Sequence, residues 1–411
     1  MINYPKRVVV TGMGLVSSLG HSPADFFLKL REYKNTVRLI DEFTSTIGLN
    51  THLGCPVKPF DLPDTFTRKK LRTMGKVSQF ACLATQYAIK DANFAQDYLI
   101  HNQNVGVAYG SCSGSSDALA DFASVIKDKN TSTLNANTYL KMMSHTTAVN
   151  IGLFFNLSGR IIPTSSACTS SSQAIGYAYE SIKHGLQKVM IAGGADELCT
   201  SQVAVFDTLF AASIKNKTPN LTPSPFDVDR DGLVLGEGAG TLILEEYEHA
   251  QKRGANIYAE LVGFSTNSDG SHPTQPEYES MQDCMQTALF NADINHTEID
   301  YISAHATGTI KGDIAESIAT KNVFGSQVPV SSLKSYIGHT LGACGAIESI
   351  NGIEMMSNNW IHPTLNLNEI DPNCAELNYV LQKGKNHDIN MFINNNFAFG
   401  GINTSLIFKK F

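Results

Sequence analysis

The chain has 411 residues, of which 42% are hydrophobic and 17% charged, and its formal net charge is −7 at pH 7. Such a composition is typical of a globular chain with a large core and excludes a disordered one, while the length allows two or three domains. The acidic balance argues against a nucleic-acid-binding protein, because no basic excess is available for phosphate contacts.

No apolar run approaches the roughly 20 residues that a membrane-spanning helix needs. The Val-rich segment after Tyr4-Pro5-Lys6-Arg7 is too short for a signal peptide. The eight cysteines show no CxxC pair and no zinc-ribbon spacing, so they are expected to be reduced and mostly buried. We therefore expect a cytoplasmic protein with no membrane span.

Strand and helix patterns alternate along the whole chain, which predicts an α/β fold. Short apolar runs predict strands over residues 7–11, 104–110, 161–166, 188–193, 240–245, 258–267, 300–305, 329–332, 390–397 and 404–409. Helical spacing predicts helices over residues 23–30, 68–91, 115–127, 139–155, 169–185, 275–291, 312–324 and 346–357. Gly12-Met13-Gly14 follows the first strand but lacks the third glycine of a dinucleotide-binding fingerprint, so no redox nucleotide is expected.

Cys168 stands where a predicted strand gives way to a predicted helix. A cysteine in the first turn of a helix faces unpaired N–H groups and the positive end of the helix dipole. Both favour the thiolate, which is the nucleophilic form. A buried structural cysteine is the alternative interpretation of any single cysteine.

Two histidines favour the catalytic interpretation of that cysteine. His305 lies in Ser303-Ala304-His305-Ala306-Thr307-Gly308-Thr309, and His339 lies in Lys334-Ser335-Tyr336-Ile337-Gly338-His339. Each histidine follows a short β-branched stretch and opens a turn rich in glycine and threonine. Both side chains are therefore expected at strand ends.

With Cys168, His305, Lys334 and His339 in this order, the chain resembles the β-ketoacyl-(acyl carrier protein) synthases of the I/II type, within the thiolase superfamily. The resemblance extends from Arg7-Val8-Val9-Val10-Thr11-Gly12 to the Phe397-Ala398-Phe399-Gly400-Gly401 turn. It implies an internally duplicated five-layer α/β/α/β/α sandwich. Residues 1–250 would form the half with the nucleophile, and residues 251–411 the half with the histidines.

The resemblance also implies the reaction, a decarboxylative Claisen condensation of acyl and malonyl thioesters by an acyltransferase. Cys168 would carry the acyl group, and the backbone N–H groups of Cys168 and Phe399 would form the oxyanion hole. His305 and His339 would donate hydrogen bonds to the malonyl thioester oxygen. Lys334 and its partner Glu348 would orient His305 and set the local field.

Further family positions suggest how the substrate is held. Phe397, Ala398 and Phe399 match a loop that gates the acyl pocket, and Ala398 replaces a glycine of the family pattern there. Ser113 aligns with a bulky residue that limits the pocket in some relatives, so a longer or stiffer chain is expected to fit. Thr307 and Thr309 match residues that bind the phosphopantetheine amides, although both are also ordinary turn-closing residues.

Family resemblance implies an acidic acyl carrier protein as partner, and the basic run Arg68, Lys69, Lys70 and Arg72 is the candidate docking patch. A solvated helix face is an equally good interpretation of that run. The phosphopantetheine would arrive on the carrier, so no resident cofactor and no metal are expected. A homodimer is implied, or a heterodimer with a chain-length-factor-like paralogue.

The pathway and the catalytic status leave alternatives open. The C-terminal segment 394–406 looks closer to ketosynthases of aryl-polyene or type II polyketide clusters, and fatty-acid elongation is the other pathway considered. A non-catalytic chain-length or scaffold subunit is the rival function, which the retained Cys168, His305, Lys334 and His339 oppose. A thiolase or a cysteine hydrolase is a further rival. Phe399 occupies the loop where thiolases carry a second cysteine.

Overall fold

The computed structural model describes residues 5–94, 96–99 and 101–411. Within these residues, eleven strands form one mixed sheet in the order β12-β10-β9-β14-β15-β8-β1-β7-β6-β4-β5. Its strands are β1 Val8–Ser17, β4 Val105–Gly110, β5 Ile161–Thr164, β6 Val189–Asp196, β7 Gly238–Glu246, β8 Ala259–Ser268, β9 Tyr301–Ser303, β10 Pro329–Ser331, β12 Asn378–Tyr379, β14 Met391–Phe397 and β15 Ile402–Lys410. Two small sheets pair β2 (Arg38–Leu39) with β3 (Leu53–Gly54) and β11 (Trp360–Ile361) with β13 (Lys385–Asn386).

Apart from β12, an additional strand at one edge, the sheet consists of two halves of five strands with the same strand order. In the N-terminal half, β5, β4 and β6 run parallel, and β7 and β1 continue the sheet antiparallel. In the C-terminal half, β10, β9 and β14 run parallel, and β15 and β8 continue antiparallel. The halves meet where β1 pairs with β8. The chain is therefore an internal duplication at the level of topology, as the resemblance implied.

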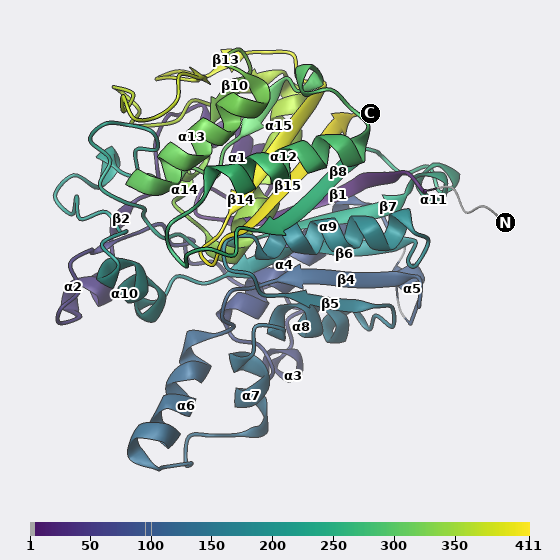
Figure 1. Cartoon of the computed structure of the whole chain (residues 1–411). Coiled ribbons are helices and arrows are strands. Elements are labelled where there is room, and N and C mark those ends of the chain that lie inside the picture. The colour runs from purple at the N-terminus through teal and green to yellow at the C-terminus, as the bar shows by residue number, and fades with distance from the viewer. Residues whose placement is uncertain (1–4, 95, 100) are drawn as a thin grey trace.

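Helices α9 (Ser170–Lys183) and α15 (Cys344–Asn358) lie between the two halves (Figure 1). Each contacts strands of both halves, and the two helices contact each other. On the outer faces, α4 (Lys76–Asp91) and α8 (Thr146–Phe155) cover the N-terminal half, while α12 (Tyr278–Ala292) covers the C-terminal half with α13 (Ile310–Phe324) beside it. This is the expected five-layer α/β/α/β/α order.

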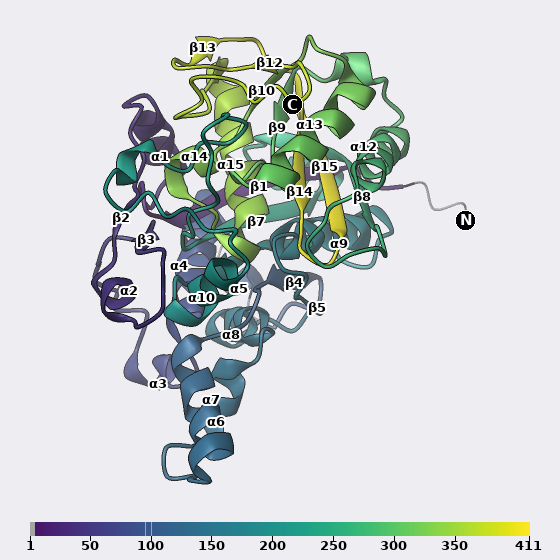
Figure 2. The same cartoon turned by 60° about the vertical axis from the view of Figure 1, so that its left-hand side comes forward.

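The remaining helices lie in connections around this framework. They are α1 Pro23–Leu30, α2 Asp41–Ser45, α3 Arg68–Leu71, α5 Gln96–Leu99, α6 Ser116–Asp128, α7 Ala136–Met142, α10 Thr200–Thr208, α11 Tyr247–Lys252 and α14 Lys334–Ile337. Helices α6 and α7 project together from the body of the molecule, as both views show (Figures 1 and 2). No helix among the described residues is both long and apolar enough to cross a membrane.

Gly12 and Gly14 allow β1 to approach α4 closely. A Cβ added to Gly12 would lie 2.4 Å from the carbonyl oxygen of Ala88, and one added to Gly14 would lie 1.9 Å from that of Ala84. Only glycine permits such contact between a strand and the helix backbone. Gly12 and Gly14 were expected to follow the first strand, but they lie within β1, which extends to Ser17, and they serve its packing against α4.

All ten predicted strands and eight predicted helices are present with shifted ends, but two helices were predicted as too long. The segment 68–91 breaks into α3 and α4 because the chain leaves helical geometry at Gly75, which has φ −87° and ψ −177°. The segment 139–155 falls into α7 and α8 because Met143 is extended, with ψ 139°. Helix α10 was not predicted, since its start, Thr200-Ser201-Gln202, carries no apolar periodicity.

Candidate active site

The nucleophile candidate lies in the turn between β5 and α9. Ala167 adopts the left-handed conformation, with φ 51°, and α9 begins at Ser170, so Cys168 is placed at the entrance of the helix. The Thr169 hydroxyl donates to the carbonyl of Ser166 at 2.7 Å and fixes the turn. Cys168 itself is only 5% exposed. The predicted location of the cysteine at a strand-to-helix switch is thus confirmed.

Burial decides the ionisation of this thiol. It raises the pKa of Cys168 to about 11, against the lowering effects of the Lys334 charge and of hydrogen bonds from the backbone N–H groups of Phe399 and Cys168. The helix start was expected to favour the thiolate, and its amides do act in that direction, but desolvation outweighs them. The resting residue is a protonated thiol at neutral pH, so it needs a proton acceptor.

His339 is the group in contact with that thiol. Its Nε2 lies 2.9 Å from the Sγ of Cys168. Burial, with the Lys334 charge adding to it, holds the pKa of His339 well below its ordinary value, so the ring is neutral. Its Nδ1 has no hydrogen-bond partner among the described residues, so no neighbour fixes the tautomer. Nε2 can therefore accept a proton at one stage and donate one at another.

His305 differs from His339 because its tautomer is fixed. The amide nitrogen of Asn396 lies 3.4 Å from Nδ1 and can only donate to it, which places the ring proton on Nε2. Glu316 accepts the backbone N–H of His305 at 2.7 Å and anchors the residue. Burial and the Lys334 charge keep the pKa of His305 well below its ordinary value. The side chain is thus a neutral donor.

Lys334 and Glu348 form a buried ion pair, 1% and 2% exposed, behind the histidines. Burial opposes the Lys334 ammonium, but the Glu348 carboxylate outweighs it, and the pKa of Lys334 lies above its ordinary value. Asn396 donates to the second oxygen of Glu348 at 2.7 Å and accepts a hydrogen bond from Ser172. The predicted pair therefore reaches His305 through Asn396, a residue to which the sequence assigned no role.

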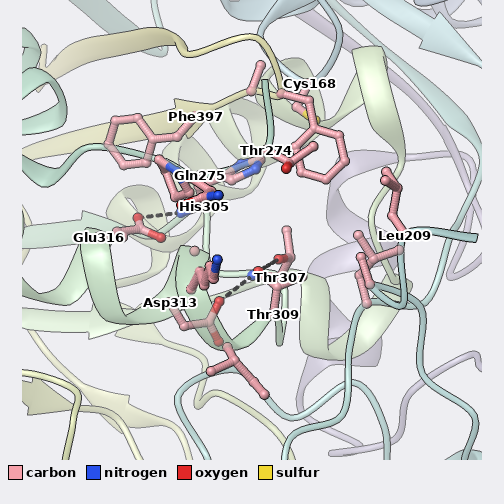
Figure 3. Close-up of a pocket in the computed structure, with 18 of the residues that line it drawn as sticks. Cys168, Leu209, Thr274, Gln275, His305, Thr307, Thr309, Asp313, Glu316 and Phe397 are labelled. Carbon is pink, nitrogen blue, oxygen red and sulfur yellow. Dashed lines mark hydrogen bonds between the residues drawn. The ribbon is translucent and has the colours of Figure 1, made fainter. Parts of the chain in front are cut away.

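The Sγ of Cys168 and one nitrogen of each histidine lie within 4.8 Å of one another, and the two rings meet edge to face at 5.3 Å. They line a cavity of about 310 Å³ (Figure 3). The cavity is also lined by the predicted gate Phe397, Ala398 and Phe399, by the predicted pantetheine residues Thr307 and Thr309, and by Phe206, Leu209, Phe210, Thr274 and Gln275. One sulfur and two imidazoles are also ligand types that zinc uses, so the site has the donor set for a metal as well.

The gate loop is unstrained at the position where alanine replaces the family glycine. Among the described residues, Gly400 and Gly401 have positive φ values of 86° and 74°, and Ala398 does not. The ring of Phe399 packs against Phe206 with centroids 5.3 Å apart. Ala398 therefore pays no conformational free energy for a positive φ in this structure. Such a cost would arise only if the gate loop moved to a conformation in which Ala398 has a positive φ.

Two predicted residues lie elsewhere than expected. Ser113 does not line the cavity; its Oγ accepts a hydrogen bond from Gln202, because α10 places that side chain in front of it. Lys70 is half-buried, and its Nζ lies 3.8 Å from the centroid of the Phe154 ring. Arg68, Lys69 and Arg72 are exposed as a docking patch requires.

A nucleophilic cysteine, two amides directed at its sulfur and two neutral imidazoles in one buried cavity define a condensing acyltransferase, on a duplicated five-layer fold. Residues 5–250 match the family model "Beta-ketoacyl synthase, N-terminal domain" and residues 258–368 match "Beta-ketoacyl synthase, C-terminal domain". The chain belongs to the β-ketoacyl synthase family, in its I/II type.

Similar proteins cover nearly the whole chain. The 3-oxoacyl-[acyl-carrier-protein] synthase 1 of Haemophilus influenzae is 35% identical over 409 residues, covering 99% of each chain. A β-ketoacyl synthase from Burkholderia phymatum STM815 superimposes with a TM-score of 0.97 and 52% identity, covering 99% of this chain and 100% of that one. The ishigamide ketosynthase/chain length factor gives a TM-score of 0.90 and 30% identity, with the same coverage.

Proposed function

We propose that this synthase elongates acyl groups carried on an acyl carrier protein, with malonyl groups as the source of two carbons. The observation that carries the proposal is the convergence of Cys168 Sγ and one nitrogen each of His305 and His339 within 4.8 Å. The relatives' activity supports the same conclusion. A non-catalytic scaffold subunit would have no need of this arrangement, so we do not favour that alternative.

In the first half-reaction, Nε2 of His339 accepts the thiol proton as the sulfur of Cys168 attacks the acyl thioester. The backbone N–H groups of Cys168 and Phe399 stabilise the tetrahedral oxyanion. As the carbon–sulfur bond to the carrier breaks, the departing pantetheine thiolate takes the proton from His339. One thioester replaces another, so the step is close to isoenergetic and leaves an acylated cysteine.

In the second half-reaction, the malonyl thioester loses carbon dioxide, and the electron pair of the broken bond becomes an enolate. His305 and His339 donate from Nε2 to its oxygen, which stabilises the developing charge without a cation. The enolate carbon attacks the acyl-cysteine, the new carbon–carbon bond forms, and Cys168 leaves as a thiolate that takes up one proton. The product is a β-ketoacyl thioester on the carrier.

Thr307 and Thr309 fit the arm that brings both substrates. Their hydroxyls lie 3.1 Å apart on the cavity wall, on the route to Cys168, where they can meet the amides of phosphopantetheine. The exposed cations Arg68, Lys69 and Arg72 are the proposed docking patch for the acidic carrier. Lys70 belongs to the same basic run, but its ammonium also contacts the ring of Phe154, so we expect it to contribute less to docking than its exposed neighbours.

We also propose that each chain consists of two domains, residues 1–250 and 251–411. We propose further that the protein is cytoplasmic and that two chains form a dimer. All eight cysteines are free, as in a reducing compartment. Strand β5 is the last strand of the sheet, and its Ile161 is 42% exposed, so an edge is available for pairing with a second copy or a paralogue. The likeness to a ketosynthase described as part of a type II PKS, with a TM-score of 0.86 and 30% identity, supports a polyketide pathway, with fatty-acid elongation as the alternative.

The direct test combines the purified protein with acyl-carrier and malonyl-carrier substrates. Mass spectrometry should show an acyl adduct on Cys168 and then a β-ketoacyl carrier product, and one carbon dioxide should be released per product. A chelator should leave the rate unchanged, because the proposed steps use no metal. Acylation of Cys168 without any condensation product would contradict the proposal, and so would a product that carries the malonyl carboxylate.

A further inference from the structure

One buried polar atom next to the gate has no hydrogen-bond partner. Gln202 donates from Nε2 to the Oγ of Ser113 at 2.7 Å, while its Oε1 is buried and has no hydrogen-bond partner within residues 5–94, 96–99 and 101–411. Leaving a buried amide oxygen without a donor is costly, and such an atom calls for a donor that is supplied later. The serine hydroxyl cannot be that donor for Oε1 in this geometry, because it accepts from the same amide group.

The Ser113–Gln202 pair lies beside an apolar cluster that includes Val203 and Phe206 and packs against the gate residue Phe399. Gln202 stands one turn before Phe206 on α10, so both side chains share a face of that helix. Val203 and Phe206 pack in one cluster with Phe399, and Cys112, the neighbour of Ser113, packs against it. Phe206 and Phe399 line the active-site cavity, whereas Ser113 and Gln202 do not.

The apolar cluster is close to the nucleophile, because its Phe206 and the packed Phe399 line the same cavity as Cys168. An acyl chain on Cys168 that displaced the Phe399 ring would enter the cluster of Val203 and Phe206, against which Cys112 packs. The Ser113–Gln202 pair adjoins that cluster, because Ser113 follows Cys112 and Gln202 precedes Val203 in the chain.

We propose that Gln202, held in place by Ser113, is a specificity-determining residue that selects acyl chains with a hydroxyl group or another hydrogen-bond donor toward their distal end. The inference rests on the proposed function and adds a substrate class to it. Oε1 of Gln202 accepts from that donor, and the walls of Val203 and Phe206 hold the apolar part of the chain. A plain alkyl chain of equal length leaves the amide oxygen unpaired, so it is accepted less well.

The test compares hexanoyl, octanoyl and decanoyl thioesters of the carrier with their ω-hydroxy counterparts. At the chain length that reaches the pair, wild-type enzyme should prefer the hydroxylated chain by about tenfold in kcat/KM for acylation of Cys168. Gln202→Met keeps the volume but removes the acceptor and should abolish that preference. Gln202→Glu keeps an acceptor and should retain it, and Ser113→Ala should weaken it by freeing the side chain.

Three results separate the possible outcomes. Equal kcat/KM for hydroxylated and plain chains at every length would overturn the proposal. An equal gain from ω-methoxy chains, which only accept hydrogen bonds, would also overturn it, because the free group would then be the amide nitrogen. Condensation of an acetyl group on Cys168 with the malonyl carrier is the control. If the β-ketoacyl product forms in wild type and in Gln202→Met, the proposed function stands whatever the selectivity shows, and if it does not form in wild type, the proposed function itself has failed.

Discussion

The two halves of the sheet share one topology, but the connections after equivalent strands carry different chemistry. The turn from β5 to α9 carries Cys168, whereas the equivalent connection from β10 to α15 carries Lys334 and His339. Likewise the end of β4 leads to Ser113 and the end of β9 leads to His305. A short turn links β14 to β15 and carries the gate, while residues 197–237 separate β6 from β7 and include α10.

This difference teaches how a duplicated fold builds one asymmetric site. The carboxyl ends of parallel strands are where α/β folds place ligands, and the duplication brings two such edges together. One half supplies the acyl acceptor and the Ser113–Gln202 pair beside the gate cluster. The other half supplies the groups that stabilise the enolate. The division predicts that changes in the two halves separate the two half-reactions.

The largest expected effect comes from the nucleophile. Cys168→Ala should lower both self-acylation and condensation by at least about 10⁴-fold, since the acyl acceptor is gone. Labelled acyl transfer and product formation measure the two steps. Cys284→Ala is the matched control, because Cys284 is also buried but lies on α12, and it should keep both steps. Elongation by Cys168→Ala would show that another group carries the acyl chain.

A change in the other half should separate the steps. His305→Ala removes a fixed Nε2 donor, so malonyl decarboxylation should fall by about 10²–10³-fold while acylation of Cys168 changes far less. His339→Ala should affect both, because the imidazole of His339 is the one whose Nε2 is hydrogen-bonded to the thiol, whereas Nδ1 of His305 faces Asn396. Carbon dioxide release and adduct formation are measured separately. Equal losses in both steps for His305→Ala would break the division between the halves.

Asn396 tests how the tautomer of His305 is set. Asn396→Ala should slow decarboxylation by about 10–100-fold, the usual cost of losing a group that orients a functional imidazole. The control is Asn395→Ala, which removes a buried amide of the same strand that bonds Ser405 and Met285 instead. We expect the two variants to lose similar stability. Only Asn396→Ala should lose decarboxylation while it keeps acylation of Cys168, because its amide acts through His305. An equal loss of decarboxylation in Asn395→Ala would contradict this.

The buried histidines should also shape the pH dependence of stability. Both have folded-state pKa values well below the ordinary value of about 6.5, so the unfolded chain binds more protons below that pH. The free energy of unfolding should therefore fall as the pH drops below about 6.5, by about 1.4 kcal/mol per pH unit for each histidine. Denaturant titrations of His305→Gln at several pH values should give a smaller acid slope than wild type, and an unchanged slope would contradict this.

The smallest effect concerns carrier docking by the N-terminal half. Lys69→Glu should raise KM for carrier substrates severalfold at low salt and spare short thioester mimics, because only a protein carrier responds to the local field. The effect should fade as salt shortens the screening length. Lys70→Glu should instead lower the melting temperature, since its Nζ faces Phe154. A KM for Lys69→Glu equal to wild type at low salt would place docking on another face.

The main strand segments and the reactive residues could be predicted because each rests on a local pattern or on a family motif. Cys168, His305, Lys334 and His339 each follow a recognisable strand. Asn396 could not be singled out, because Asn394-Asn395-Asn396 offers three equal amides and only the strand register turns one toward His305. The same holds for Gln202, whose helix has no apolar periodicity, and for the pKa of Cys168, which depends on burial from distant segments.

The central position of α9 and α15 has a consequence for how the molecule folds. Each helix belongs to one half but is covered on its other side by the partner half. Neither half can bury its own helix alone, so the interface between them forms late, from segments far apart in sequence. Cys168 meets His339 only at that moment. The return of thiol acylation after dilution from denaturant therefore reports when the halves dock, and it should lag behind the recovery of secondary structure.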